Sequence, residues 1–127
     1  LPIYSSSGAA GLDLFANESI ELKPSQRRAI RTDIACEIPL GYVGLIWDRS
    51  GNALNKGLHT LGGVIDSDYR GNIAVILHNT SLESILIEQG QKIAQMLIQP
   101  VQRFEIDEVQ EVSSTQRGHK GFGSTGD

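Results

Sequence analysis

The 127-residue chain has few cysteines and histidines, no excess of basic residues and no long apolar run. Its single cysteine, Cys36, excludes an intrachain disulfide framework and a cysteine-rich zinc site. The three histidines, His59, His78 and His119, lack the spacing of metal ligands. Acidic residues outnumber basic ones, 15 against 11, which argues against a nucleic-acid partner. No apolar run approaches the roughly 20 residues of a membrane span, so no membrane partner is expected.

Cysteine usage also bears on location. A single cysteine favours a reducing compartment. We expect a cytoplasmic protein, or a nuclear or viral one if the source is eukaryotic or viral. The net charge of −4 does not exclude a nucleotide ligand, because a divalent cation and a few Arg or Lys side chains can hold a polyphosphate.

Helical periodicity is scarce, and a period of two dominates instead. The one helix candidate is Ser50–Lys56, which Ser50 could cap. From Ile30 to Ile38 every second residue is apolar or small, as in a half-buried strand. Similar short runs occur at Tyr42–Trp47, Asn72–Leu77, Ser84–Ile87, Lys92–Ile98 and Val101–Ile106. Many short strands with short connections predict an all-β sandwich or barrel.

The C-terminal segment differs in composition from the rest. Residues 117–126 read RGHKGFGSTG, with glycine at four of the ten positions. Such a stretch cannot support a packed core. We therefore divide the chain into a β domain, residues 1–116, and a flexible Gly-rich arm, residues 117–127.

The arm also carries groups suited to a nucleotide. Phe122 is an isolated aromatic that could stack on a flat ligand. Arg117, Ser124 and Thr125 would give a folded arm three donors for phosphate oxygens. The segment is not a Walker A loop, because Ser124 stands where that motif requires Lys. A plain disordered tail is the alternative.

A polar segment, DSDYRG, follows the apolar Gly63-Val64-Ile65. It can be a hairpin turn. A calcium loop fits poorly, because Arg70 and Leu77 occupy positions where ligands are required. In the functional reading, Asp66 at a strand end holds a water that attacks an electrophile, and the Tyr69 ring packs against a sugar or base.

Three shorter segments are ambiguous one by one. Asp48-Arg49-Ser50-Gly51 opens the predicted helix, and can be either a capped helix start with a surface Arg or an anion site. AGLDL (residues 10–14) and GQKIAQ (residues 90–95) are ordinary strand or strand-edge sequences when taken alone.

Taken in order, AGLDL, DRSG, GGVIDSDYRG, GQKIAQ and RGHKGFGSTG resemble the five motifs of the trimeric dUTPase family. They span nearly the whole chain, and the third and fifth are long and specific. The resemblance implies a jelly-roll-like β fold and a homotrimer with active sites at subunit interfaces. It also implies Mg²⁺-dependent hydrolysis of dUTP to dUMP and pyrophosphate, which limits uracil in DNA and supplies dUMP for dTMP synthesis.

The resemblance assigns roles at the reacting end of the substrate. Asp66 is similar to the base that activates the water attacking the α-phosphorus, and Tyr69 to the residue packed beneath the deoxyribose. The backbone around Thr60, Val64, Ile65 and Ala74 would form the slot that recognises uracil. Phe122 of the arm would cover the base.

The phosphates and the metal are assigned in the same way. Asp13 would act on Mg²⁺ indirectly, through bound water. The phosphate-binding residues implied by the resemblance come from a neighbouring chain and from the arm of a third chain: Arg49, Ser50, Gly51, Gln95, Arg117, Gly123, Ser124 and Thr125.

The chain departs from the family pattern at three positions. Asp48 stands where Pro is frequent, and its carboxylate would disfavour a phosphate unless it points away or pairs with Arg49. Asn52 replaces a small apolar residue, and Thr60 stands where some members place Asn. Three other functions remain open: a dCTP deaminase on the same fold, a nucleotide-sensing module without catalysis, and a plain β-sandwich interaction domain.

Overall fold

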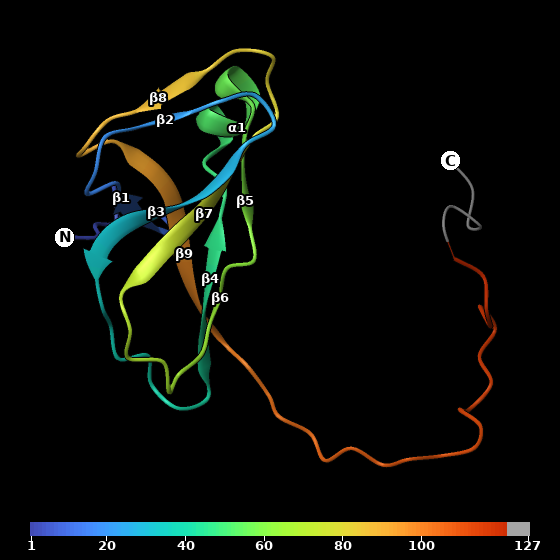
Figure 1. The fold of residues 1–127 in the computed structure, drawn as a ribbon. Helices are drawn as coiled ribbons and strands as arrows, with labels where there is room; N and C mark the ends of the chain where they lie inside the picture. The colour runs from blue at the N-terminus through green and yellow to red at the C-terminus, as the bar shows by residue number, and fades with distance from the viewer. Residues whose placement is uncertain (122–127) are drawn as a thin grey trace.

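The computed structural model describes residues 1–121, and these form a β body followed by an extended C-terminal segment (Figure 1). The elements are β1 (Leu12–Phe15), β2 (Ile20–Leu22), β3 (Arg27–Ile34), β4 (Tyr42–Trp47), α1 (Ser50–Lys56), β5 (Leu58–Leu61), β6 (Val64–Ile65), β7 (Ile73–Asn79), β8 (Ile85–Ile87) and β9 (Lys92–Pro100). The predicted all-β, jelly-roll-like class is confirmed.

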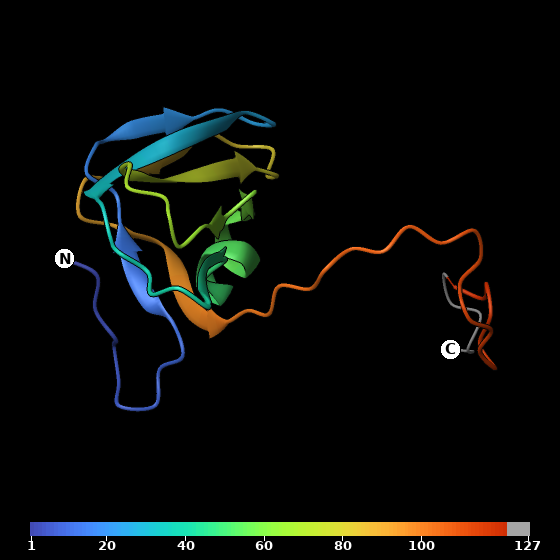
Figure 2. The same ribbon diagram turned by 90° about the horizontal axis from the view of Figure 1, so that it is seen from below.

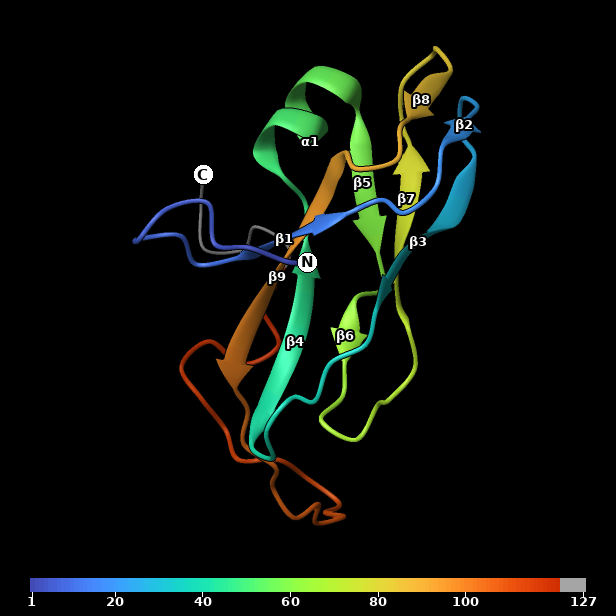
Figure 3. The ribbon, with the colours of Figure 1, turned by 90° about the vertical axis from the view of Figure 1, so that its left-hand side faces the viewer.

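Antiparallel strands form the body in three sheets. One has four strands in the order β1-β9-β4-β6, the second pairs β2 with β8, and the third has the order β3-β7-β5. The four-stranded and three-stranded sheets face each other as two layers (Figure 3). Strands distant in sequence are therefore neighbours, and this brings the separate sequence motifs together.

The core lies between these two layers. Strand β7 shows the alternation that a half-buried strand requires, because Ile73, Val75 and Leu77 are buried and Ala74 is exposed. From the opposite sheet, Leu14 and Met96 contribute to the same apolar cluster. Burial of such side chains, about 1.5–3 kcal/mol each, is the main favourable term in folding.

Helix α1 begins and ends as predicted, at Ser50 and Lys56. The predicted capping role of Ser50 is wrong, because Arg49 is the N-cap residue and no side chain caps the helix. Gly57 ends the helix in the left-handed conformation at φ +65°, which glycine adopts without steric cost.

Strand β3 is shorter than the sequence pattern suggests. It ends at Ile34, although the buried and exposed alternation continues to Ile38. The ladder with β7 shifts register between Arg31 and Ile34, where Asp33 adopts φ +53°. Asp tolerates this left-handed region because its short side chain can bond locally, here with Arg31. The Asp33 carboxylate also accepts from Asn17, which is distant in sequence.

The strand predicted at Val101–Ile106 is absent. The Val101 N–H donates to the Gly41 carbonyl, but residues beyond it have no ladder partner within the described chain. A strand needs a neighbouring backbone, and the described segment from 101 to 121 runs away from the β body (Figure 2). Its apolar side chains, including Phe104 and Ile106, are exposed. In residues 1–121, no helix has the length and hydropathy of a membrane span.

Candidate active site

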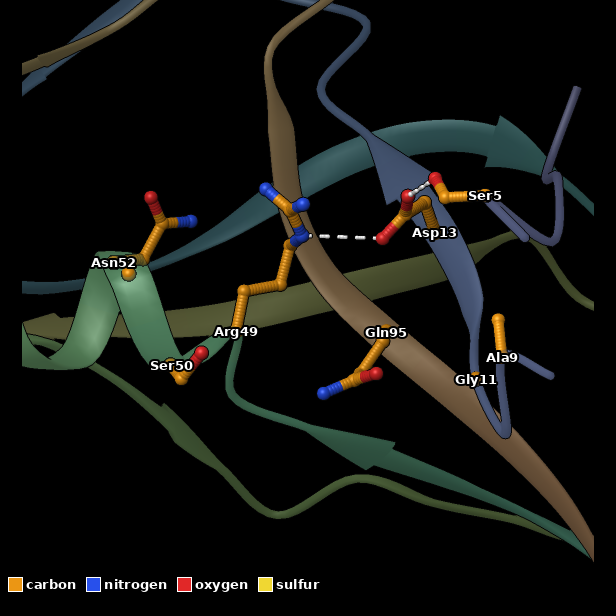
Figure 4. Close-up of a pocket in the computed structure, with 9 residues that line it drawn as sticks. Ser5, Ala9, Gly11, Asp13, Arg49, Ser50, Asn52 and Gln95 are labelled. Carbon is orange, nitrogen blue, oxygen red and sulfur yellow. Dashed lines mark hydrogen bonds and ion pairs between the residues drawn. The ribbon is translucent and has the colours of Figure 1, made fainter.

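The first, second and fourth motifs meet in one hollow between β1, β9 and the start of α1 (Figure 4). The Arg49 and Gln95 side chains point into this space from different elements. The lining residues are Ser5, Ala9, Gly11, Asp13, Arg49, Ser50, Gly51, Asn52 and Gln95. The structure thus brings together all five predicted residues of this group: Asp13, Arg49, Ser50, Gly51 and Gln95.

Asp13 is the buried centre of this hollow. It is 6 % exposed, and its Oδ1 lies 3.1 Å from Arg49 Nε. Its Oδ2 lies 2.7 Å from Lys92 Nζ and accepts a hydrogen bond of 2.5 Å from Ser5 Oγ. Burial raises the pKa of Asp13, but the Lys92 and Ser5 hydrogen bonds and the Arg49 charge outweigh it and lower that pKa. The carboxylate therefore stays ionised and holds the Arg49 guanidinium in the hollow.

Gly11 passes closely over Gln95, which explains the glycine of the first motif. A Cβ at position 11 would lie 2.6 Å from Gln95 Oε1 and 3.0 Å from Gln95 Cβ. Gln95 Nε2 donates to the Asp48 carbonyl at 2.8 Å, so its amide is fixed at the edge of the hollow. The smallest residue at position 11 is therefore what leaves room for Gln95.

Asp48, one of the departures from the family pattern, points away from Arg49. Its Oδ1 accepts from the Thr60 N–H at 2.6 Å, and its Oδ2 lies 2.7 Å from His59 Nδ1. Burial raises the pKa of Asp48, but the bonds from His59 and Thr60 outweigh it and lower that pKa. The charge of Asp48 is thus compensated on β5, outside the hollow.

Asn52 also has a structural explanation. It is buried, and its Nδ2 donates to the backbone carbonyls of Lys92 and Ile93 at 3.1 and 3.4 Å. A small apolar residue could not make these bonds. Asn52 therefore links α1 by hydrogen bonds to β9, the strand that carries Gln95.

The third motif and residues of β3 and β7 form a second hollow, which lies between β6 and the three-stranded sheet. It is lined by Ala29, Val64, Ile65, Asp66, Tyr69, Asn72, Ile73, Ala74 and Ile76. Five predicted residues, Val64, Ile65, Asp66, Tyr69 and Ala74, are thus brought together. Asp66 follows β6 directly and is exposed.

Tyr69 folds back over its own turn. Its hydroxyl donates to the Asn72 carbonyl at 2.9 Å, and a Cβ at Gly71 would lie 2.4 Å from that hydroxyl oxygen. The glycine of DYRG therefore gives the ring its place. The ring remains 44 % exposed beside Asp66, so one face can still receive a ligand.

Two glycines set the path into this second hollow. Gly62 and Gly63 have φ values of +67° and +100°, and a Cβ at Gly63 would lie 3.0 Å from the Ile46 carbonyl oxygen. The chain can therefore turn sharply between β5 and β6. Thr60 lines a neighbouring hollow with Asp48 and His59, and it does not line the one that contains Asp66.

The remaining predicted residues lie in the arm. Arg117 is exposed, and its Nε donates to the Lys120 carbonyl at 2.9 Å. Phe122, Gly123, Ser124 and Thr125 lie outside the described residues. The boundary at 116/117 stays a prediction, and the last strand of the body, β9, ends at Pro100.

Within one chain the two hollows share no lining residue. The cationic group Arg49 belongs to one, and the exposed carboxylate Asp66 belongs to the other. A phosphorylated ligand bound in the first hollow would therefore meet no water-activating carboxylate from the same hollow except Asp13, whose oxygens already hold two cations and a hydroxyl.

No group of three or more His, Cys, Asp or Glu side chains in residues 1–121 is arranged to hold a metal. The residues of the first hollow fit a cation whose ligands are mainly phosphate oxygens and water. Asp13 is the carboxylate that lines this hollow. A divalent cation bound by an all-protein cage does not fit this part of the chain.

Sequence reasoning missed three contributors. Ser5 and Lys92 both bond Asp13, and Asn72 accepts the Tyr69 hydroxyl hydrogen bond. Lys92 lies inside GQKIAQ, so its motif was a usable signal. Ser5 belongs to a serine run with no periodic pattern, and the bridge between Ile3 and Asp13 brings it to the site.

Comparisons with known proteins agree on one family. The family model described as dUTPase matches residues 1–126. The deoxyuridine 5'-triphosphate nucleotidohydrolase of Hydrogenobaculum sp. (strain Y04AAS1) is 50 % identical, covering 99 % of this chain and 90 % of that protein. The enzyme of Anaplasma marginale (strain St. Maries), with the same description, is 46 % identical over 99 % of this chain and 88 % of its own length.

Solved structures are similar over the same length. The Staphylococcus bacteriophage 80alpha dUTPase with dUpNHpp has a TM-score of 0.93 and 34 % identity, covering 100 % of this chain and 92 % of that one. A dUTPase from phage phi11 of S. aureus, whose structure shows the coordination of a structural Mg(II) ion, has a TM-score of 0.84 and 29 % identity, covering 90 % and 92 %.

Proposed function

Because this chain belongs to the dUTPase family and is a dUTP-hydrolysing enzyme, we propose that it forms dUMP and pyrophosphate by attack of an Asp66-activated water on the α-phosphorus. The observation that supports this most directly is the gathering of the motifs into two hollows of different chemistry. One presents Arg49, Ser50 and Gln95, which suit phosphates, and the other presents Asp66 beside Tyr69.

Asp66 acts as general base. Its carboxylate is exposed at the end of β6, so a water can bind to it and lose a proton as the oxygen attacks phosphorus. A positioned base of this kind contributes about 10²–10⁴-fold to the rate. The Tyr69 ring packs beneath the deoxyribose and leaves no room for a 2′-hydroxyl. Uracil lies against the backbone near Val64, Ile65 and Ala74, with Thr60 at the start of that segment.

Arg49, Ser50, Gly51 and Gln95 hold the phosphates. Arg49 is aimed by Asp13 and keeps guanidinium nitrogens free for phosphate oxygens, since only its Nε bonds Asp13. These donors hold the phosphate chain in line for attack, and positioning supplies a large part of such rate enhancements.

Mg²⁺ is the proposed cofactor. Bound by the phosphate oxygens, it would neutralise charge on the triphosphate and hold the leaving pyrophosphate. Asp13 would contact it through bound water, using the carboxylate lone pair that Arg49, Lys92 and Ser5 leave available. Asp13 therefore links Arg49 to the metal-bearing side of the ligand.

We further propose a homotrimer with the active sites between subunits. The two hollows of one chain share no residue, so a phosphate-binding hollow of one subunit can complete the Asp66 hollow of its neighbour. Val64, which lines the Asp66 hollow, and Trp47, which lines the neighbouring hollow with Thr60, are exposed apolar side chains that such a contact would cover.

The arm, residues 117–127, would come from the third subunit. The segment after Pro100 leads away from its own β body, which fits a contribution to another chain (Figure 1). Phe122 would cap the base, and Arg117, Gly123, Ser124 and Thr125 would close on the β- and γ-phosphates. In the cell, the reaction would keep dUTP low and supply dUMP for dTMP synthesis.

Pyrophosphate release from dUTP, dTTP, dCTP and UTP, with Mg²⁺ and with EDTA, tests the proposal. Release from dUTP alone, abolished by EDTA, is the expected result. Ammonia from dCTP would instead identify a deaminase. Tight binding of dUTP without release would identify a sensing module.

A further inference from the structure

One residue between β4 and α1, Asp48, belongs neither to the β ladder nor to the helix. Trp47 is the last paired residue of β4, opposite Gln95, and Arg49 is the uncapped N-cap residue of α1. Asp48 lies between them. Whatever fixes Asp48 therefore fixes the backbone from which the Arg49 side chain starts.

Asp48 makes three polar contacts of its own. Its carboxylate bonds the Thr60 N–H at 2.6 Å and His59 Nδ1 at 2.7 Å, and its carbonyl accepts from Gln95 Nε2 at 2.8 Å. The side chain is 26 % exposed, so these bonds are partly shielded from water. A histidine Nδ1 can donate both as the cation and as the neutral Nδ1–H tautomer, so the contact does not require a charge on His59.

The two contacts of the Asp48 carboxylate join the two layers of the body. Strand β4 belongs to the four-stranded sheet, whereas β5, which carries His59 and Thr60, is the edge strand of the three-stranded sheet. An edge strand has backbone N–H groups without a ladder partner, and the Asp48 carboxylate satisfies one of them. Asp48 thus connects the element leading to the phosphates with the segment leading to the uracil slot.

We propose that Asp48 is a positioning residue for the phosphate-binding group, acting through Arg49 and Gln95. The inference rests on the proposed function of that hollow. The carboxylate faces β5 and does not line the hollow that contains Arg49 and Gln95, so its effect on the phosphates is indirect. Without it, Thr60 stays held by its pairing with Leu77 of β7, whereas the Asp48–Arg49 connection has no such ladder. The phosphate side therefore loosens more than the uracil side.

The experiment compares Asp48→Ala, Asp48→Asn and a control, Glu18→Ala. Glu18 also uses a carboxylate oxygen to accept from a backbone N–H, that of Arg31 at 2.8 Å, and it lines neither hollow. Each variant has its dissociation constants measured for dUpNHpp with Mg²⁺, which carries the phosphates, and for deoxyuridine, which lacks them. Turnover of dUTP gives kcat and KM for the same set.

We expect Asp48→Ala to weaken dUpNHpp about tenfold and to raise KM similarly, with deoxyuridine changed less than about twofold. Asp48→Asn should lie between this variant and the wild type, because the amide oxygen can still accept from Thr60. Glu18→Ala should leave both constants unchanged. If Asp48→Ala does not fold, the ordering of Asp48→Asn against the wild type carries the test.

Unchanged dUpNHpp affinity in both Asp48 variants would overturn the proposal. Equal weakening of dUpNHpp and deoxyuridine would also overturn it, because it would show a general structural role. The wild-type enzyme is assayed first. No pyrophosphate release from dUTP would refute the proposed function itself, whereas normal release with unchanged Asp48 variants would refute only the positioning role.

Discussion

Replacing Gly11 with Ala tests the phosphate-binding hollow with one methyl group. The added Cβ would stand 2.6 Å from Gln95 Oε1 and 3.0 Å from Gln95 Cβ. The amide end can rotate away, but the Cβ contact requires a shift of the backbone or of the whole side chain. Gly11 does not adopt a positive φ, so the cost arises from this contact and not from the backbone conformation.

The expected change in stability is small because two effects oppose each other. Moving Gln95 loses its bond to the Asp48 carbonyl, worth about 0.5–1.5 kcal/mol. Ala in place of Gly restricts the unfolded chain and restores about 0.4–1 kcal/mol. The net effect should stay within about 1 kcal/mol, or a Tm shift of about 4 °C. Function should change more, because a hydrogen bond to a charged phosphate is worth about 1.5–3 kcal/mol.

We therefore expect Gly11→Ala to raise KM for dUTP about tenfold or more while Tm barely moves. Initial rates of pyrophosphate release and a thermal unfolding scan measure the two quantities. Gly8→Ala is the matched control, because it lies in the same N-terminal segment and its Cβ would meet nothing within 4 Å. A wild-type KM in Gly11→Ala would show that Gln95 does not contribute to substrate binding in the place the structure gives it.

Four other predictions concern the proposed chemistry and the ionised carboxylates. Asp66→Asn should retain dUpNHpp binding and lose about 10²–10⁴-fold in kcat; near-normal turnover would move the base elsewhere. Tyr69→Ala should reduce the preference for dUTP over UTP by about tenfold, measured as the ratio of kcat/KM values, and an unchanged ratio would remove its sugar-packing role. Deletion of residues 117–127 should lower kcat/KM about 100-fold, and unaltered kinetics would contradict a closing arm. The pKa values of Asp13 and Asp48 lie below the ordinary 3.8, so their stabilisation is present above that pH and is lost as pH falls through the lower folded-state values. Urea midpoints measured from pH 6 to 2 should fall in this acid range, with a shallower fall in Asp48→Asn.

Local patterns predicted much of the fold. The predicted bounds of β4 and α1 match those observed, although Arg49 and not Ser50 is the N-cap residue of the helix. Val101–Ile106 shows the same alternation and forms no strand, since a ladder depends on a partner that sequence spacing does not reveal. The bend at Asp33 was likewise invisible, because it depends on contacts with Asn17.

The site, too, was predicted from the sequence only in part. The resemblance to the dUTPase motifs implied that Arg49 and Gln95 bind phosphates and that Asp13 acts on the metal, and the structure places all three around one hollow. The sequence did not predict the orientation of the Asp48 side chain, which depends on a backbone N–H twelve residues later, that of Thr60. Charge type can be read from the sequence, but the partner that compensates a charge is fixed only by the packing of one sheet against the other.

The separation of the two hollows has a genetic consequence in the proposed trimer. A chain defective at Asp66 still offers an intact Arg49 hollow, and a chain defective at Arg49 still offers an intact Asp66 hollow. Mixed trimers of the two would therefore rebuild working sites that neither parent has. Two loss-of-function alleles could complement each other when co-expressed, whereas one inactive allele would silence sites contributed partly by healthy copies.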